Sequence, residues 1–172
     1  MTFDFKKYCR HQHDVVCNQQ YDDVHPYSFH LALVYVQYNR WKHLLEFKTR
    51  QEREIVENAI WGHDLIEDER VTYNDIKNRV GERTADIIFG VTDSQGKTRA
   101  ERKDDAFWKR LTADELSVFV KLCDVMANAL YSYMTGSSMY DKYGKEFPDF
   151  KMKAFVPKFK PMFDQLEKIL SL

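Results

Sequence analysis

The segment 58–68, with the sequence NAIWGHDLIED, gathers four side chains that can bind metals or move protons. His63 is followed by Asp64, and Glu67 is followed by Asp68 one helical turn later. On a helix that advances about 100° per residue, these four side chains share an arc of roughly 140°. Apolar residues fill much of the remaining helix surface, which predicts a buried helix. Buried ionised groups are costly unless they are paired or bind a cation, so the segment indicates metal binding or acid–base chemistry.

A further carboxylate, Asp124, borders an apolar stripe that runs from Leu116 to Leu130. Lys121 lies about one turn before it, and Asn128 lies one turn after it. A buried aspartate with no partner would neutralise, pair with a cation or bind a metal. The spacing alone leaves two alternatives open, a salt bridge to Lys121 and a bond to a metal ion.

His30 follows the sequence PYSF at residues 26–29 and lies on the apolar face of a predicted helix. A single histidine on such a face is more often a core residue than a metal ligand. His30 becomes a candidate metal ligand because the chain combines two imidazoles with two carboxylates: His30, His63, Asp64 and Asp124. This mixed nitrogen and oxygen set suits Mn²⁺, with Fe²⁺, Co²⁺, Zn²⁺ or Mg²⁺ less favoured. Four protein ligands would leave coordination positions for water and a phosphate oxygen.

Five segments, in this order along the chain, resemble the HD-domain metal-dependent phosphohydrolases. They are PYSFH at 26–30, GHDLIED at 62–68 followed by VG at 80–81, VTD at 91–93, ERK at 101–103, and VKLCD at 120–124 with Asn128. Within that superfamily, the chain resembles the Rel/Spo hydrolase domain and the stand-alone small alarmone hydrolases. Those enzymes remove the 3′-pyrophosphate from guanosine tetra- and pentaphosphate with the help of manganese.

The resemblance implies a role for each candidate site residue. The metal ligands would be His30, His63, Asp64 and Asp124, and the catalytic pair that handles the attacking water and its protons would be Glu67 and Asp68. The substrate would be contacted by Lys121, Asn128, Arg102, Lys103 and Tyr27. Simpler alternatives remain open, because the acidic pair could be a solvated helix end and the basic residues a solvated charged surface.

The chain departs from the family pattern in the segment that precedes Tyr27. Alarmone hydrolases carry an Arg-Lys pair there, which contacts the guanine base and phosphates, whereas this chain has Gln19 and Gln20. Glutamine cannot supply the cationic plane that stacks on a base. A tyrosine could stack instead, and the candidates are Tyr21, Tyr27 and the segment 140–143.

Composition limits the class of protein. The chain has 172 residues, with 26 Lys and Arg against 27 Asp and Glu, so it lacks the basic field that attracts nucleic-acid polymers. Its three cysteines are odd in number and lack CxxC spacing, which favours reduced thiols in the cytoplasm. Neither a secretory signal nor a membrane span is expected. The predicted partner is a small nucleotide substrate, and association into a homo-oligomer is left open.

Apolar residues recur mostly every three or four positions, which predicts an all-α fold. We expect one HD-type helical bundle over residues 1–172, with the metal site between core helices. Predicted helices cover about 3–17, 28–40, 50–67, 73–78, 81–91, 112–135, 138–144 and 161–171. Capping pairs start two of them, Thr72 with Asp75 and Thr112 with Glu115. The segment 91–105 is expected to be a polar loop that carries several cations.

The leading functional hypothesis is a Mn²⁺-dependent nucleotide phosphohydrolase, most similar to a (p)ppGpp 3′-pyrophosphohydrolase, that uses a metal-activated water. One alternative keeps the metal site but assigns another purine nucleotide or a nucleoside monophosphate as substrate. Another alternative, from a different class, is a nucleotide-binding protein that keeps the HD scaffold without turnover. The complete set of candidate ligands argues for the enzymes.

Overall fold

The computed structural model describes residues 3–68 and 70–172, with Asp68 described in its backbone alone. The helices are α1 (Phe5–His11), the π-helical turn η1 (Gln12–Val16), α2 (Ser28–Trp41), the 3₁₀ turn η2 (Lys42–Leu45), α3 (Arg50–Gly62), α4 (Leu65–Asp68), α5 (Tyr73–Val80), α6 (Glu82–Val91), α7 (Arg99–Arg102), α8 (Asp105–Thr112), α9 (Glu115–Thr135), α10 (Met139–Ala154), the 3₁₀ turn η3 (Pro157–Phe159) and α11 (Lys160–Ile169). The described residues form no strand, and one isolated bridge pairs Gln20 with Pro26. The expected all-α fold is confirmed.

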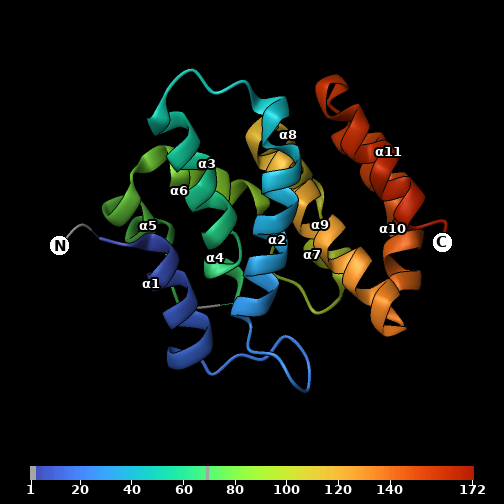
Figure 1. Ribbon diagram of the computed structural model, residues 1–172, viewed down its shortest axis with the longest axis horizontal. Helices are drawn as coiled ribbons and strands as arrows, with labels where there is room; N and C mark the ends of the chain where they lie inside the picture. The colour runs from blue at the N-terminus through green and yellow to red at the C-terminus, as the bar shows by residue number, and fades with distance from the viewer. Residues whose placement is uncertain (1–2, 69) are drawn as a thin grey trace.

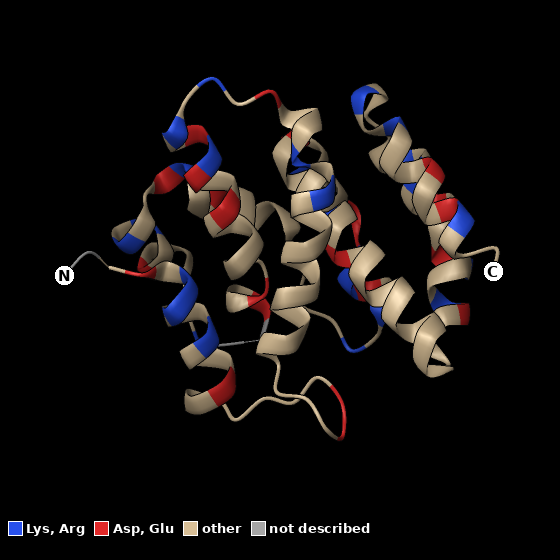
Figure 2. Cartoon of the chain, viewed as in Figure 1, with Lys and Arg blue, Asp and Glu red and all other residues tan. Residues whose placement is uncertain are grey.

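Two helices, α2 and α9, pack against each other at the centre of the molecule (Figure 1). Helices α1, α3 and α5 lie on one side of this pair in the view, and α10 and α11 lie on the other. The long helix α9 also contacts α3, α6, α8, α10 and α11, so the described helices share one hydrophobic core. Figure 2 shows that most of the α2 ribbon carries neither acidic nor basic side chains, which suits its central position.

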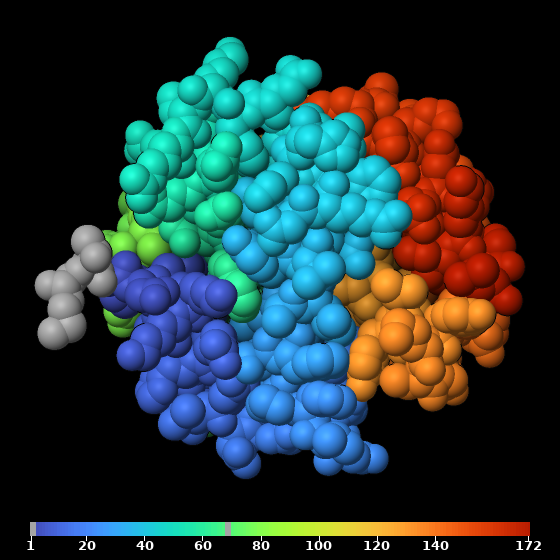
Figure 3. Space-filling view, in the orientation of Figure 1, coloured from blue at the N-terminus to red at the C-terminus, as the bar shows by residue number. Residues whose placement is uncertain are grey.

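The C-terminal helix α11 closes this core. Its buried residues are Met162, Phe163, Leu166 and Ile169, at the three- and four-residue spacing of one helix face. Helix α11 therefore covers one side of the core. Figure 3 shows α10 and α11 as a continuous outer layer beside α2.

The predicted helix 50–67 is wrong in one important respect, because it breaks between Gly62 and Leu65. The imidazole of His63 explains the break. Its Nδ1–H donates to the carbonyl oxygen of Ile60 at 2.9 Å, an acceptor that a backbone N–H would use in a continuing helix. His63 and Asp64 therefore lie in a turn between α3 and α4 rather than on a regular helix face.

The region between α6 and α9 also differs from the prediction. Helix α8 was missed, although Asp104 caps it by accepting from the backbone N–H of Phe107 at 2.8 Å. Helix α7 interrupts the predicted polar loop. Thr112 ends α8 instead of capping α9, whose first turn is capped by Asp114. The other predicted capping box, Thr72 with Asp75, is confirmed.

Helix α10 is longer than predicted and continues through Pro148 to Ala154. Pro148 is exposed, whereas its neighbours Phe147 and Phe150 are buried. Burial of these rings against the core favours the helix despite the missing N–H of proline. Tertiary packing thus overrides a local breaker signal.

Candidate metal centre and active site

Three elements supply the side chains that converge at the centre of the molecule. His30 comes from the first turn of α2, His63 from the turn after α3, and Asp124 from the middle of α9. Their potential ligand atoms all lie within 4.8 Å of one another. The Nε2 atom of His30 is 3.2 Å from Nε2 of His63 and 3.4 Å from Oδ1 of Asp124. All three side chains are buried.

The fourth predicted ligand, Asp64, joins the same group. Its Oδ2 atom lies 2.9 Å from Nε2 of His63 and 3.4 Å from Nε2 of His30. Because His63 donates from Nδ1 to Ile60, the neutral ring presents the lone pair of Nε2 to the centre. Two imidazole nitrogens and two carboxylates that face one another fit a divalent cation, which satisfies lone pairs that otherwise require protons.

The electrostatics of the centre favour the same conclusion. Burial lowers the pKa of His30, but the nearby carboxylates of Asp124 and Asp64 outweigh it and raise that pKa to about 9. Burial opposes the ionisation of Asp124 as well, but Lys121 and the two histidines hold its pKa below the ordinary value. Asp124 therefore stays ionised, and without an ion its charge is balanced by Lys121 and by a proton on His30, which a divalent cation would replace.

Each carboxylate is held by further side chains. The Tyr27 hydroxyl donates to Oδ2 of Asp64 at 2.7 Å, and the Asn128 amide donates to Oδ1 of Asp124 at 2.6 Å. Lys121 Nζ lies 3.2 Å from Oδ2 of Asp124, while Oδ1 faces the histidines. The two alternatives for Asp124 are thus compatible, because one oxygen pairs with the lysine and the other faces the candidate metal position.

A polar pocket of about 210 Å³ opens beside this centre. Its wall includes all five residues predicted to contact substrate: Tyr27, Arg102, Lys103, Lys121 and Asn128. A wider groove of about 1170 Å³ lies along α1 and α3, and its described lining contains none of the candidate ligands. The smaller pocket is the one that combines charge with potential metal ligands, so we take it as the candidate active site.

Glu67, on α4, also lines this pocket. Its Oε2 accepts from the backbone N–H of Asp93 at 3.2 Å, and Oε1 lies 3.7 Å from a nitrogen of Arg102. Burial raises the pKa of the Glu67 carboxyl to about 7, which suits a group that exchanges protons near neutral pH. The other member of the predicted acidic pair, Asp68, has a side chain that lies outside the described residues.

Sequence reasoning assigned no site role to two charged residues of the pocket wall, Asp93 and Arg99, whereas Tyr143, which also lines the pocket, belongs to the segment considered for stacking on a base. Asp93 belongs to the VTD segment, so its place in the motif series was a usable signal. Arg99 pairs with Glu146 of α10 through two hydrogen bonds, of 2.7 and 2.9 Å. Its approach to the pocket depends on how the segment 93–105 packs, which no local pattern gives.

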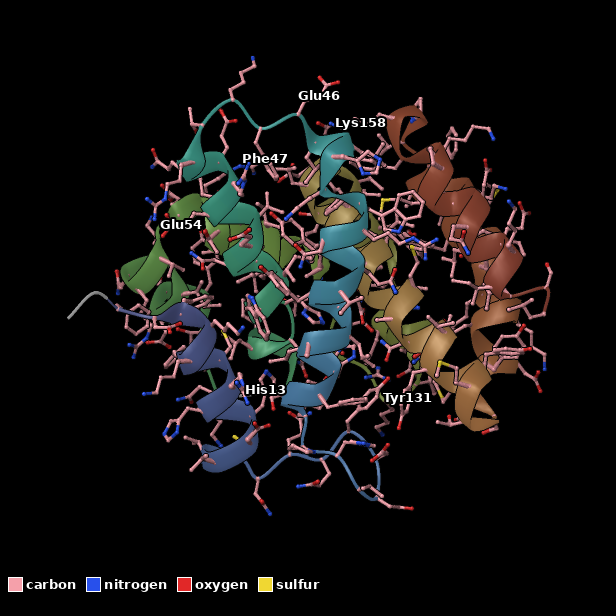
Figure 4. The ribbon with its side chains drawn as sticks, in the orientation of Figure 1. His13, Glu46, Phe47, Glu54, Tyr131 and Lys158 are labelled. Carbon is pink, nitrogen blue, oxygen red and sulfur yellow. The ribbon has the colours of Figure 1, made fainter. Side chains whose placement is uncertain are left out.

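The segment before Tyr27 packs behind the residues of the site and contributes no residue to the described pocket wall. Gln19 Oε1 lies 2.6 Å from Nδ1 of His13, and the His13 ring stacks on Tyr27 with centroids 4.6 Å apart. Tyr21 stacks on His30 with centroids 5.1 Å apart. Two of the tyrosines considered for a nucleobase, Tyr21 and Tyr27, therefore contact histidines of this chain. In Figure 4, His13 and Tyr131 lie on either side of the N-terminal end of α2.

Comparison with known proteins establishes the fold. No family model and no curated sequence matches the chain. The structure shares its all-helical fold with a solved structure. It aligns with a solved metazoan ortholog of SpoT, described as hydrolysing ppGpp and acting in starvation responses, with a TM-score of 0.67 and 20% identity. The alignment covers 97% of this chain and 89% of that one. Separately, no helix in the described residues is long and apolar enough to cross a bilayer.

Proposed function

We propose that this chain is a metal-dependent phosphohydrolase that removes pyrophosphate from the 3′ position of a guanine nucleotide such as ppGpp. The observation that carries the proposal is the convergence of His30, His63, Asp64 and Asp124 beside a polar pocket. The shared fold with a protein that hydrolyses ppGpp supports the choice of substrate class.

We assign the residues around the pocket different roles in hydrolysis. A divalent ion such as Mn²⁺ at the four ligands would supply a water of lowered pKa and polarise a phosphate oxygen. Glu67 would accept a proton from the attacking water. Arg102, Lys103 and Lys121 would neutralise the phosphate oxygens, on which charge accumulates during phosphoryl transfer. Equal numbers of acidic and basic side chains line the pocket, so a bound divalent ion leaves net positive charge for an anionic substrate.

Another candidate function keeps this chemistry but changes the substrate to a nucleoside monophosphate or another purine nucleotide. Gln19 packs against His13 instead of lining the described pocket, so it offers no contact to a base there. The volume of about 210 Å³ is also below the roughly 300–1,000 Å³ typical of ligand sites. A smaller phosphate ester would fill such a pocket better.

The test is hydrolysis by Mn²⁺-loaded protein of a panel that includes ppGpp, pppGpp and nucleoside 5′-monophosphates, with product analysis that separates pyrophosphate from orthophosphate. The proposal predicts release of pyrophosphate and preference for the 3′-pyrophosphate substrates. Preferential release of orthophosphate from monophosphates would favour the other candidate. Absence of turnover on the whole panel would contradict both.

The variants His63→Ala and Asp124→Ala test the assigned ligands. Each is expected to lose bound Mn²⁺ in elemental analysis, because each removes a donor that faces the centre. The exposed residues His43 and Asp141 supply matched controls, and His43→Ala and Asp141→Ala should retain the metal. Full metal content in the two ligand variants would show that the ion binds elsewhere.

A further inference from the structure

The segment 17–27, which connects η1 to α2, has a defined structure built around Asp22. The Asp22 side chain accepts from the backbone N–H groups of Val24 and His25, at 2.8 and 2.7 Å. The hydroxyl of Tyr131, on α9, donates to the same carboxylate. Figure 4 labels Tyr131 near this connection. These contacts fix the segment against the C-terminal half of α9, on the side of the metal centre.

Tyr21, next to Asp22, contacts the metal centre in two ways. Its ring stacks on the His30 imidazole, with an interplanar angle of 24°. Its hydroxyl donates to Oδ1 of Asn128 at 2.9 Å. Asn128 in turn donates from Nδ2 to Oδ1 of Asp124 at 2.6 Å. One tyrosine thus touches one candidate ligand directly and reaches a second through an amide.

The hydroxyl of Tyr21 holds the Asn128 amide in the direction that the Asp124 carboxylate requires. An amide presents a donor at one end and an acceptor at the other, and rotation by 180° exchanges them. A donor at Oδ1 keeps Nδ2 directed at the carboxylate of Asp124. A tyrosine hydroxyl is protonated at neutral pH, so it can donate to Oδ1 of Asn128. The reversed amide would place its oxygen against the Asp124 carboxylate, which is repulsive.

We propose that Tyr21 is a positioning residue of the metal centre, which packs on His30 and acts through Asn128 to orient the Asp124 carboxylate toward the ion. The inference rests on the proposed metal-dependent function. Partners of this kind fix the geometry of metal ligands, and their loss typically costs about 10- to 100-fold in metal affinity. Tyr21 is therefore unavailable as a stacking platform for a nucleobase.

The experiment is calorimetric titration of metal-free protein with Mn²⁺. Tyr21→Phe keeps the ring but removes the hydroxyl, and it should weaken Mn²⁺ binding by about 10-fold. Asn128→Ala removes the amide and should weaken binding by about 10- to 100-fold. Because Tyr21 acts through Asn128, adding Tyr21→Phe to Asn128→Ala should change the affinity by less than about 2-fold.

The matched control is Tyr131→Phe, which removes a hydroxyl that holds the same segment but does not reach Asp124. It should leave Mn²⁺ affinity unchanged. Equal weakening by Tyr131→Phe would overturn the inference, since general ordering of the segment would then explain the effect. Unchanged binding in Tyr21→Phe, or independent effects of Tyr21→Phe and Asn128→Ala, would overturn it too.

The same titration separates this inference from the proposed hydrolysis. If Mn²⁺ binding depends on Tyr21 as expected but no phosphate ester is hydrolysed, the positioning role stands and the enzymatic function fails. If the unmodified protein binds no Mn²⁺, the inference fails with its premise. Turnover with a Mn²⁺ affinity that is insensitive to Tyr21 supports the function and contradicts the positioning role.

Discussion

Glu67, the proposed general base, lines the candidate active site. Its carboxyl group is largely buried between the backbone of Asp93, the guanidinium of Arg102 and the pocket. Desolvation disfavours its ionised form, and this effect dominates over the opposing influence of Lys121. A carboxyl with a pKa of about 7 loses its proton easily enough to serve as a base at neutral pH.

The activity should follow the ionisation of Glu67. A base acts in its deprotonated form, so kcat/KM should rise with pH toward about 7 and level off above it. Positive charge from a bound ion would move this rise to lower pH. Glu67→Gln should slow hydrolysis by about 100- to 10,000-fold and abolish the rise. Rate measurements across this range, with metal content checked at each pH, provide the test.

The exposed glutamate Glu82 offers a control for this substitution. Glu82→Gln should keep both the rate and the pH profile, because its partner is the exposed Lys77. A Glu67→Gln enzyme that retains the same pH-dependent rise would show that another group is the base.

At the level of elements, the segment 93–105 depends on α10 for its position beside the pocket. Helix α7 buries none of its own residues, so packing alone does not fix it. Glu146 of α10 accepts from Arg99 and, at 2.8 Å, from Lys103. These cations hold the pKa of Glu146 at about 2 despite the opposing effect of burial. One carboxylate thus orients two cations of the pocket wall.

Glu146→Gln should raise KM for an anionic substrate by about 10-fold while kcat stays within about 2-fold. Loss of the carboxylate weakens charge-assisted hydrogen bonds that hold Arg99 and Lys103 in place. Glu167→Gln is the matched control, because it breaks an ion pair to Lys151 of the same helix. Steady-state kinetics measure KM and kcat of both variants. A lower KM in Glu146→Gln would mean that the carboxylate competes with substrate.

The contact between α6 and α9 requires a glycine. A Cβ atom at Gly90 would lie 2.4 Å from Oγ and 3.0 Å from Cβ of Ser117, both inside normal contact distance. Gly90→Ala should therefore lower the free energy of unfolding by about 1–3 kcal/mol. Gly144→Ala, in α10, meets nothing within 4 Å and should be neutral or stabilising by up to about 1 kcal/mol. Urea denaturation measures the free energy of unfolding of the two variants. Equal values would contradict the close approach of α6 and α9 at Gly90.

At the scale of the whole molecule, the candidate metal centre joins segments that are far apart in sequence. Its candidate ligands come from α2, the turn between α3 and α4, and α9. Since the unfolded chain does not hold these groups together, binding of an ion favours the folded state. Metal binding should therefore raise the free energy of unfolding as well as support activity.

Mn²⁺ at about 100 times its Kd should stabilise the fold by about 2.7 kcal/mol. For a chain of this size, that corresponds to a rise in Tm of roughly 5–11 °C. A thermal melt with and without Mn²⁺, followed by addition of a chelator, measures the effect. The shift should vanish in Asp124→Ala. A shift of the same size in that variant would place the stabilising ion at another site.

Several features of this protein follow from local sequence. The adjacency of His63 and Asp64, the apolar stripe around Asp124 and the capping box of α5 depend on neighbours within one or two turns. Helical periodicity indicated the all-α fold because it reports which face of a helix must be buried. Residue type and order were therefore enough to nominate the four candidate ligands that the structure brings together.

Other features were decided by tertiary structure alone. The break before His63 depends on its ring capturing the Ile60 carbonyl, and Arg99 reaches the pocket because Glu146 holds it. Tyr21 packs on His30 because its segment folds back onto α9. Periodicity fixes which face of a helix is buried, whereas the packing of distant segments fixes what that face meets. The ligand types were therefore determined by the sequence, and their orientation and the wall of the pocket by the fold.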